Sequence, residues 1–211
     1  MSWFKKKSPI SDFDWEVEEK EPSFLREAGE FVIEIIKVAV ISVVIIVPIR
    51  YFLIQPFYVK GASMEPNFYD HEYLIIDEIS YRFRAPDRGD IIVFRYPLDP
   101  SQYFIKRIIG LPGEKVELNQ GKIFLYNDKY PAGEAVDENI YIQPGVETRA
   151  FNNKTYILKE DEYFVLGDNR EMSKDSRFFG PVNKSFITGR VWLRGWPFSR
   201  VAVFENPAYN F

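Results

Sequence analysis

The sequence contains no cysteine, which excludes disulfide bonds, thiolate nucleophiles and zinc sites built from cysteine. Histidine occurs only once, at His71, so a metal site would need carboxylates alone, and no acidic cluster has a suitable pattern. We therefore expect neither a metal nor another cofactor. His71 lies in the polar turn "YDHEY", which also argues against the histidine base that serine hydrolases commonly use.

An excess of positive charge is lacking too. The formal net charge is -4 and the sequence pI is about 5.3, so we expect no nucleic acid as a partner. With 211 residues, 46% of them hydrophobic and 17% aromatic, the chain is suited to one medium folded domain with a short additional segment. No internal repeat is evident.

Long apolar runs are also scarce, and the one candidate lies at residues 31–54, "FVIEIIKVAVISVVIIVPIRYFLI". Its uncharged part is short, but the whole segment gives roughly 36 Å of helix, more than the roughly 30 Å of a hydrocarbon layer. Lys37 and Arg50 can extend to the lipid surface, and Glu34 must lie near the headgroups. We predict one transmembrane helix over 31–54; the alternative is a buried helix of a soluble core.

The preceding residues, 1–30, are charge-rich and are predicted to form a polar tail, with the helix entered near Pro22 and Ser23. Their lysine and arginine residues favour a cytoplasmic N-terminus. We therefore expect a single-pass protein of the cell membrane whose remaining residues lie on the extracytoplasmic side.

Beyond residue 55 the sequence changes to short runs of Val, Ile, Phe and Tyr separated by Gly, Pro, Asn and Asp, a pattern typical of strands and turns. The expected strands are 57–62, 72–78, 90–96, 102–109, 114–118, 122–126, 155–158, 162–166, 187–194 and one near 200–204. We predict a mainly β protein with an antiparallel sheet or partly open barrel. Its core comprises 55–118 and 161–211, and residues 119–160 form a small inserted cap.

The stretch "VKGASMEPNF" places Ser63 just beyond the apolar segment. A serine hydroxyl needs a base to become a nucleophile, and without a suitable histidine the remaining choice is a lysine whose pKa is lowered by burial. In "YFIKRIIG", strand alternation places Lys106 on one face with Phe104 and Ile108, and Arg107 on the other. Lys106 is therefore the candidate base, although a strand lysine is more often exposed to solvent.

Four segments together resemble a known family. "GASMEPNF", "RGDIIVFRYP", "YFIKRIIGLPGEKV" and "YFVLGDNREMSKDSRFFGPV" are similar, in this order, to the four conserved boxes of the type I signal peptidases. These are membrane-anchored Ser-Lys endopeptidases that remove signal peptides from exported proteins. With the apolar segment, the resemblance covers about residues 30 to 194.

The resemblance implies a role for each matching residue. Ser63 matches the nucleophile and Lys106 the general base, with Ser173 orienting the lysine. Supporting roles fall to an ion pair and a turn formed by Asp175, Arg177, Gly167, Asp168 and Asn169.

The oxyanion donors are only partly implied. The Ser63 backbone N–H is the first donor. The second is expected in the neighbourhood of Gly61, where some members carry a hydroxyl side chain and others glycine; a backbone group or a water would then serve. Asn67 and the "REMS" segment depart from the family's usual threonine and "RDNS".

The family's substrate binds as an added β-strand, with small residues first and third before the cut, as in Ala-X-Ala. The matching pocket residues are Phe57, Val59, Met64, Phe68, Val93, Phe104 and Ile105. The alternative is that these side chains simply fill the β core.

The implied partners are the signal peptides of exported preproteins and the lipid bilayer, with the protein acting as a monomer near the protein-translocation channel. Trp192, Trp196 and Phe198 are candidates for contact with the bilayer surface, or else core residues. Two rival functions stay open: a self-cleaving Ser-Lys peptidase of the repressor type, and an inactive membrane-tethered domain that binds exported peptides or assembles a complex.

Overall fold

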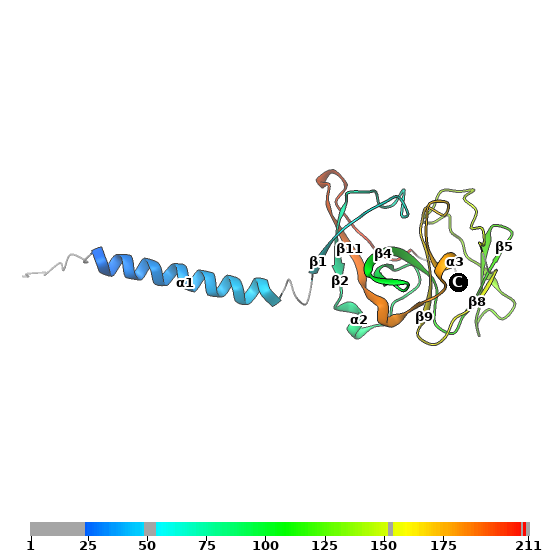
Figure 1. The fold of residues 1–211 in the computed structure, drawn as a ribbon, viewed down its shortest axis with the longest axis horizontal. Coiled ribbons are helices and arrows are strands. Elements are labelled where there is room, and N and C mark those ends of the chain that lie inside the picture. Colours follow the sequence, from blue (N-terminus) through cyan, green and yellow to red (C-terminus); the bar gives the residue numbers. More distant parts are fainter. Residues whose placement is uncertain (1–23, 49–53, 152–153, 208, 210–211) are drawn as a thin grey trace, which may run out of the picture. The chain divides into compact units, whose positions relative to one another are not determined.

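The computed structural model describes residues 24–48, 54–151, 154–207 and 209. The chain divides after Ile45 into two compact units, the first of which contains most of helix α1 and the second all of the strands. Figure 1 shows both units coloured along the sequence.

Helix α1 spans Phe24–Pro48 and so begins within the segment predicted as a polar tail. Residues 24–30 belong to the helix because their charged side chains favour it: Glu27 lies in the first turn, and Arg26 and Glu30 form an i,i+4 ion pair at 3.0 Å. The rest of the predicted tail, 1–23, lies outside the described residues.

No helix in the described parts of the chain combines the length and the apolarity that crossing a membrane requires. Of the segment 31–54 predicted to span the membrane, residues 49–53 lie outside the described residues. The transmembrane helix therefore stays a prediction.

The larger sheet is antiparallel and forms most of the second unit. Its strands follow the order β1 (Ile54–Tyr58), β2 (Tyr73–Asp77), β11 (Ile187–Trp196), β3 (Ile91–Tyr96), β4 (Asp99–Gly110), β9 (Glu162–Leu166) and β10 (Val182–Asn183), with β12 (Ala202–Val203) paired to β11. Alternate residues of β2 are buried, as expected of a strand with one face on a core, whereas Tyr163–Leu166 of β9 are all buried, so both faces of that strand are covered. Figure 1 shows β1, β2 and β11 at one end of this unit and β5 and β8 at the other.

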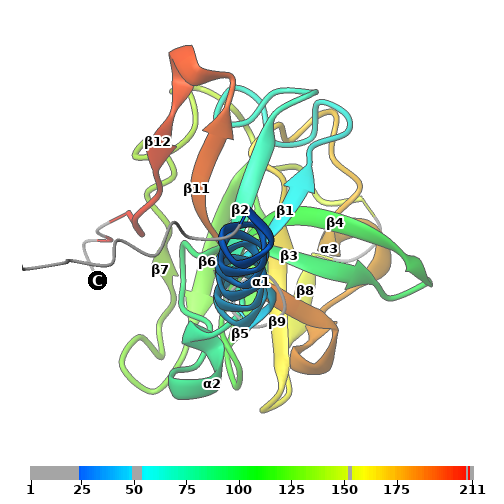
Figure 2. The same cartoon turned by 90° about the vertical axis from the view of Figure 1, so that its left-hand side faces the viewer.

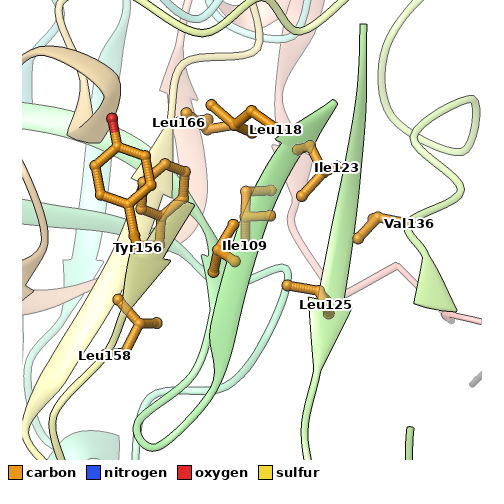
Figure 3. Close-up of a cluster of buried hydrophobic side chains, with 10 residues drawn as sticks. Ile109, Leu118, Ile123, Leu125, Val136, Tyr156, Leu158 and Leu166 are labelled. Carbon is orange, nitrogen blue, oxygen red and sulfur yellow. The ribbon is translucent and has the colours of Figure 1, made fainter. Parts of the chain in front are cut away.

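The smaller sheet is also antiparallel and has the order β7 (Glu134–Ala135), β6 (Lys122–Tyr126), β5 (Lys115–Asn119) and β8 (Thr155–Ile157). A hydrophobic cluster joins it to the larger sheet: Ile109 and Leu166 of the larger sheet contact Leu118 and Leu125 of the smaller one (Figure 3). Residues 119–160, the predicted insert, supply β6, β7 and β8, while β5 precedes them.

The described residues of the unit also form four short helical turns: α2 (Ser80–Phe83), α3 (Ser176–Phe179), η2 (Lys184–Phe186) and η3 (Phe198–Arg200). These turns and the two-residue strands β7 and β10 were missed by the sequence analysis because they are too short to show a periodicity.

The predicted fold class is confirmed in its coarse form: the unit is mainly β, its sheets are antiparallel, and neither closes into a barrel. The first strand differs most from its predicted bounds. The strand predicted over 57–62 spans Ile54–Tyr58 instead. The Val59 N–H still bonds to the Glu72 carbonyl at 2.9 Å, in the register of β1 and β2, and the chain then turns at Gly61, which adopts a φ of 87°. The chain therefore turns, rather than continuing as a strand, just before Ser63.

Candidate active site

Ser63 lies in a turn that follows β1 and is fixed by two buried neighbours. Met64 and Phe68 are almost fully buried in the same hydrophobic cluster as Val59, and the Phe68 N–H donates to the Met64 carbonyl at 2.9 Å. Ser63 itself is half-buried. The core thus anchors the turn on the far side of the serine and leaves its hydroxyl accessible.

The backbone near Ser63 is further held by Asp70. The Gly61 N–H donates to Asp70 Oδ1 at 3.0 Å, so this N–H is already engaged and is not free to act as the second oxyanion donor. The Ser63 N–H, by contrast, has no hydrogen-bond acceptor among the described residues. It is therefore available to a negatively charged oxygen.

Lys106 comes from β4 and meets Ser63 directly. Its Nζ lies 2.7 Å from Ser63 Oγ and 2.7 Å from the Ile105 carbonyl, and only 3% of the residue is exposed. Phe104, on the same strand face, has its ring centroid 5.5 Å from Nζ. Strand alternation and the turn after β1 therefore bring together the two residues that the sequence analysis selected.

The electrostatic environment favours the neutral form of this lysine. Burial lowers the pKa of the Lys106 ammonium to about 8, against the opposing effect of the Asp175 and Asp168 carboxylates. A group with that pKa is partly deprotonated near neutral pH, as a general base must be.

Gly167 lies where the Ser63 and Ser173 segments come closest. A Cβ on Gly167 would lie 2.2 Å from Ser173 Oγ and 2.4 Å from the Ser63 carbonyl oxygen, so any side chain would push these segments apart. The Asn169 N–H donates to the same carbonyl at 3.1 Å. Ser173 Oγ is buried and, within the described part of the chain, hydrogen-bonds neither Lys106 nor any other group.

Asp175 and Arg177 form the ion pair that the resemblance implied. Arg177 Nε and Nη2 each lie 2.8 Å from the Asp175 carboxylate, and both side chains are almost fully buried. Asp175 also caps α3 by accepting the Arg177 N–H, and it accepts the Gly167 N–H at 3.1 Å. One carboxylate thus joins the short helix to the glycine segment beside Ser63.

A second arginine–carboxylate pair, between Arg107 and Asp168, was not predicted from the sequence. Arg107 Nε and Nη2 lie 2.9 Å and 2.7 Å from the two Asp168 oxygens, and Asn67 Nδ2 donates to Oδ2 at 2.7 Å. A signal was present: alternation sets Arg107 between Ile105 and Ile109, and a cation on such an apolar face needs a carboxylate. The departure at Asn67 supplies a further donor to this pair.

A cleft of about 610 Å³ opens over Ser63 and Lys106 between β1 and β4. Five of the predicted pocket residues line it: Phe57, Val59, Val93, Phe104 and Ile105. The other two, Met64 and Phe68, do not line this cleft and pack in the core, as the alternative anticipated. The cleft is also lined by residues that were not predicted from the sequence, among them Leu74, Tyr103, Met172 and Lys174.

The strands beside this cleft have unpaired edges. Among the described strands, β1 pairs only with β2, and the part of β4 before Arg107 pairs only with β3. Figure 2 shows β1, in cyan, running beside β4, in green. Free backbone donors and acceptors on such edges can bind an extended peptide.

No metal site accompanies this arrangement in the described residues, where no three His, Asp or Glu side chains gather around a common point.

Comparisons with known proteins point to one family. Residues 32–196 match the family described as "Signal peptidase, peptidase S26". The probable signal peptidase I-2 of Synechocystis sp. is 38% identical over 182 residues, which cover 83% of this chain and 78% of that protein. Signal peptidase IB of Staphylococcus aureus is 32% identical over 184 residues, covering 82% and 93% of the two chains.

A crystal structure of a signal peptidase I from Enterococcus faecalis is also similar, with 32% identity and a TM-score of 0.40, covering 51% of this chain and 97% of that one.

The family match spans most of the chain, and the two curated relatives exceed 30% identity over most of their length. Members of this family are serine endopeptidases with signal peptides as substrates, and they are typically membrane-associated. This chain therefore belongs to the signal peptidase I family of serine endopeptidases, peptidase family S26.

Proposed function

We propose that this signal peptidase uses Ser63 as its nucleophile and Lys106 as its general base. The observation that carries the proposal is the 2.7 Å contact between Lys106 Nζ and Ser63 Oγ at the floor of an open cleft. The burial that lowers the pKa of Lys106 to about 8 supports it, because only the neutral lysine accepts the serine proton and the lower pKa increases the neutral fraction.

Hydrolysis then proceeds in two steps. Neutral Lys106 takes the Ser63 proton while Ser63 Oγ bonds to the scissile carbonyl carbon, and the Ser63 N–H stabilises the oxyanion. The Lys106 ammonium next donates its proton to the leaving nitrogen, the C–N bond breaks, and an ester to Ser63 forms. Water attacks this ester, Lys106 accepts the water's proton, and that proton returns to Ser63 Oγ as the signal peptide is released.

The two buried carboxylates stabilise this arrangement while their charges are balanced. Asp168 is paired with Arg107, and Asp175 with Arg177, so neither forms an ion pair with Lys106 that would keep it protonated. Ser173, whose hydroxyl is unpaired in the described structure, orients the lysine as a neutral hydrogen-bonding group during the reaction.

The substrate binds as an extended strand along the free edges of β1 and β4. Bulky walls such as Phe57, Val93 and Phe104 leave shallow pockets, which accept alanine at the first and third positions before the cut. Backbone pairing tolerates many sequences, and the pockets set the position of cleavage.

The protein works at the outer face of the cell membrane. Apolar side chains of α1 are exposed along its length, including Phe31, Ile41 and Ile46, and we assign residues 31–54 to a single-pass anchor with a cytoplasmic N-terminus. The chain acts as a monomer near the translocation channel. Tethering both enzyme and signal peptide to one membrane raises their effective concentration.

Exposed aromatic residues near η3 provide a second lipid contact. Trp196 and Phe198 are 48% and 77% exposed and pack edge to face, and Trp192 is 40% exposed. Replacing Trp196 and Phe198 by serine should weaken liposome binding by the full-length protein, measured by flotation. Unchanged binding would contradict this contact.

The central test is cleavage of a synthetic preprotein with an Ala-X-Ala site by the detergent-solubilised full chain. Wild type should cut after the second alanine, located by mass spectrometry, and Ser63→Ala and Lys106→Ala should both lose activity. Lys122→Ala, which removes an exposed lysine from β6, is the matched control and should cut normally. Peptide binding without cleavage by folded wild type would favour an inactive binding domain.

A further inference from the structure

A second cleft, of about 890 Å³, lies on the other side of the nucleophile turn. Glu65 and Pro66, directly after the Ser63 turn, form one part of its lining, and Asn169 and Glu171 form another. The third part comes from residues 142–151, which belong to the predicted insert. The proposed mechanism uses none of the groups in that third part.

The two clefts share no lining residue among those described, but neighbouring residues of the same two segments line them. Ser63 and Met172 line the first cleft, whereas Glu65 and Glu171, their near neighbours in sequence, line the second. The hydrogen bond from the Asn169 N–H to the Ser63 carbonyl holds the two lining segments together. A polypeptide that fills the first cleft up to the bond cut at Ser63 can therefore continue along these segments toward the second cleft.

Most of the charged side chains that line the second cleft are paired. Its buried arginines are paired, Arg170 with Glu138 and Arg177 with Asp175, and on its surface Arg149 is paired with Glu147. Asp168, which also lines the cleft, is neutralised by Arg107.

Two carboxylates are left over. Glu65, partly buried, and Glu171, exposed, have no ion-pair or hydrogen-bonding partner for their side chains in the described residues. The cleft thus presents an uncompensated negative charge on each side of the path away from Ser63, and this favours positively charged over acidic side chains.

We propose that this second cleft binds the first residues of the mature protein, after the cut, and that Glu65 and Glu171 make it select against acidic residues there. The inference rests on the proposed function of Ser63 and Lys106. It gives the 142–151 part of the insert a role as a wall of the substrate path and makes Glu65 and Glu171 specificity-determining residues.

The test uses two fluorogenic peptides that are identical through an Ala-X-Ala site and differ only after it. One carries lysine and the other glutamate at the second and third positions after the cut. Wild type should show a kcat/KM about five- to tenfold higher for the lysine peptide at low ionic strength, as expected for two exposed charge contacts. High salt should reduce this ratio.

The double variant Glu65→Gln/Glu171→Gln should bring the ratio to within about twofold of one, because both carboxylates lose their charge. Comparing two peptides on the same enzyme cancels any loss of activity common to both. Glu134→Gln/Glu160→Gln changes the net charge equally at exposed positions outside both clefts and should keep the wild-type ratio.

A second peptide pair, with lysine or glutamate at the fifth position before the cut, should not respond to Glu65→Gln/Glu171→Gln. Equal cutting of the first pair by wild type, or a preference that persists in the double variant, would overturn this inference while leaving the Ser-Lys mechanism intact. Failure of wild type to cut any of the peptides would instead overturn the proposed function, and this inference with it.

Discussion

The two faces of strand β4 each bury a cation, but with different partners. Lys106 contacts a hydroxyl and a carbonyl, both uncharged, and its pKa is lowered to about 8. For Arg107, burial disfavours the charge, yet the Asp168 carboxylate raises the pKa of the guanidinium above its ordinary value. The pKa values of two neighbouring residues thus shift in opposite directions, because strand alternation places their side chains in different surroundings.

The chemistry of the two side chains matches these surroundings. Lysine can lose its proton when its charge is not balanced, whereas arginine stays charged and needs a carboxylate of matching shape. By engaging Asp168, Arg107 also occupies a carboxylate that would otherwise favour protonated Lys106. The Arg107–Asp168 pair therefore helps to keep the pKa of Lys106 low.

Removing the paired cation should have the largest effect. Arg107→Met leaves the fully buried Asp168 without its counter-ion and should lower the free energy of unfolding by about 3–5 kcal/mol, measured by urea denaturation. The double variant Arg107→Met/Asp168→Asn should recover part of this loss, because an amide needs no counter-ion. Unfolding midpoints equal to wild type would show that the pair is not needed.

The second-largest effect is expected from filling the space at Gly167, beside Ser63 and Ser173. Gly167→Ala places a methyl group against Ser173 and the Ser63 carbonyl, so kcat should fall by about 100-fold as the Ser63 turn shifts. Gly195→Ala is the matched control: its Cβ would meet nothing closer than 3.9 Å, and activity should be kept. Normal cleavage by Gly167→Ala would show that the turn position tolerates movement.

Removing Lys106, the buried cation without an ion-pair partner among the described residues, should stabilise the protein, whereas removing Arg107 should destabilise it. At pH 7 the buried charge of Lys106 costs folding about 3 kcal/mol, so Lys106→Met, after losing two hydrogen bonds, should stabilise the protein by about 1–2 kcal/mol. The unfolded state binds more protons between pH 8 and 10.5, so wild-type stability rises over that range and the variant's advantage shrinks. A destabilised Lys106→Met at pH 7 would contradict this.

The smallest effect concerns pH. With a Lys106 pKa of about 8, roughly a tenth of the enzyme holds the neutral base at pH 7, so kcat/KM should rise about tenfold to a plateau above pH 9. Initial rates on a peptide without titrating groups in this range measure the profile. A flat profile from pH 6 to 9 would mean that Lys106 is not the titrating base.

Much of the site could be predicted from local patterns. The alternation in "YFIKRIIG" was enough to separate Lys106 from Arg107, and the lack of cysteine and of a suitable histidine left lysine as the candidate base for Ser63. The same alternation did not reveal Asp168 as the partner of Arg107, because the two are separated by 61 positions and meet only when β4 pairs with β9. Met64 and Phe68 were assigned to the pockets by the resemblance, and the sequence could not separate this from the core alternative, because an apolar residue beside a cleft and one beneath it have the same sequence signature.

The sequence by itself determined the antiparallel β character, the choice of Ser63 and Lys106, and the resemblance to signal peptidases, since these depend on residue type, period and spacing along the chain. Only the tertiary structure decided which carboxylate neutralises which arginine, which apolar residues reach the cleft, and that a second cleft begins at the nucleophile turn. These features depend on contacts between distant segments, and strand pairing and core packing, rather than local pattern, determine which segments meet.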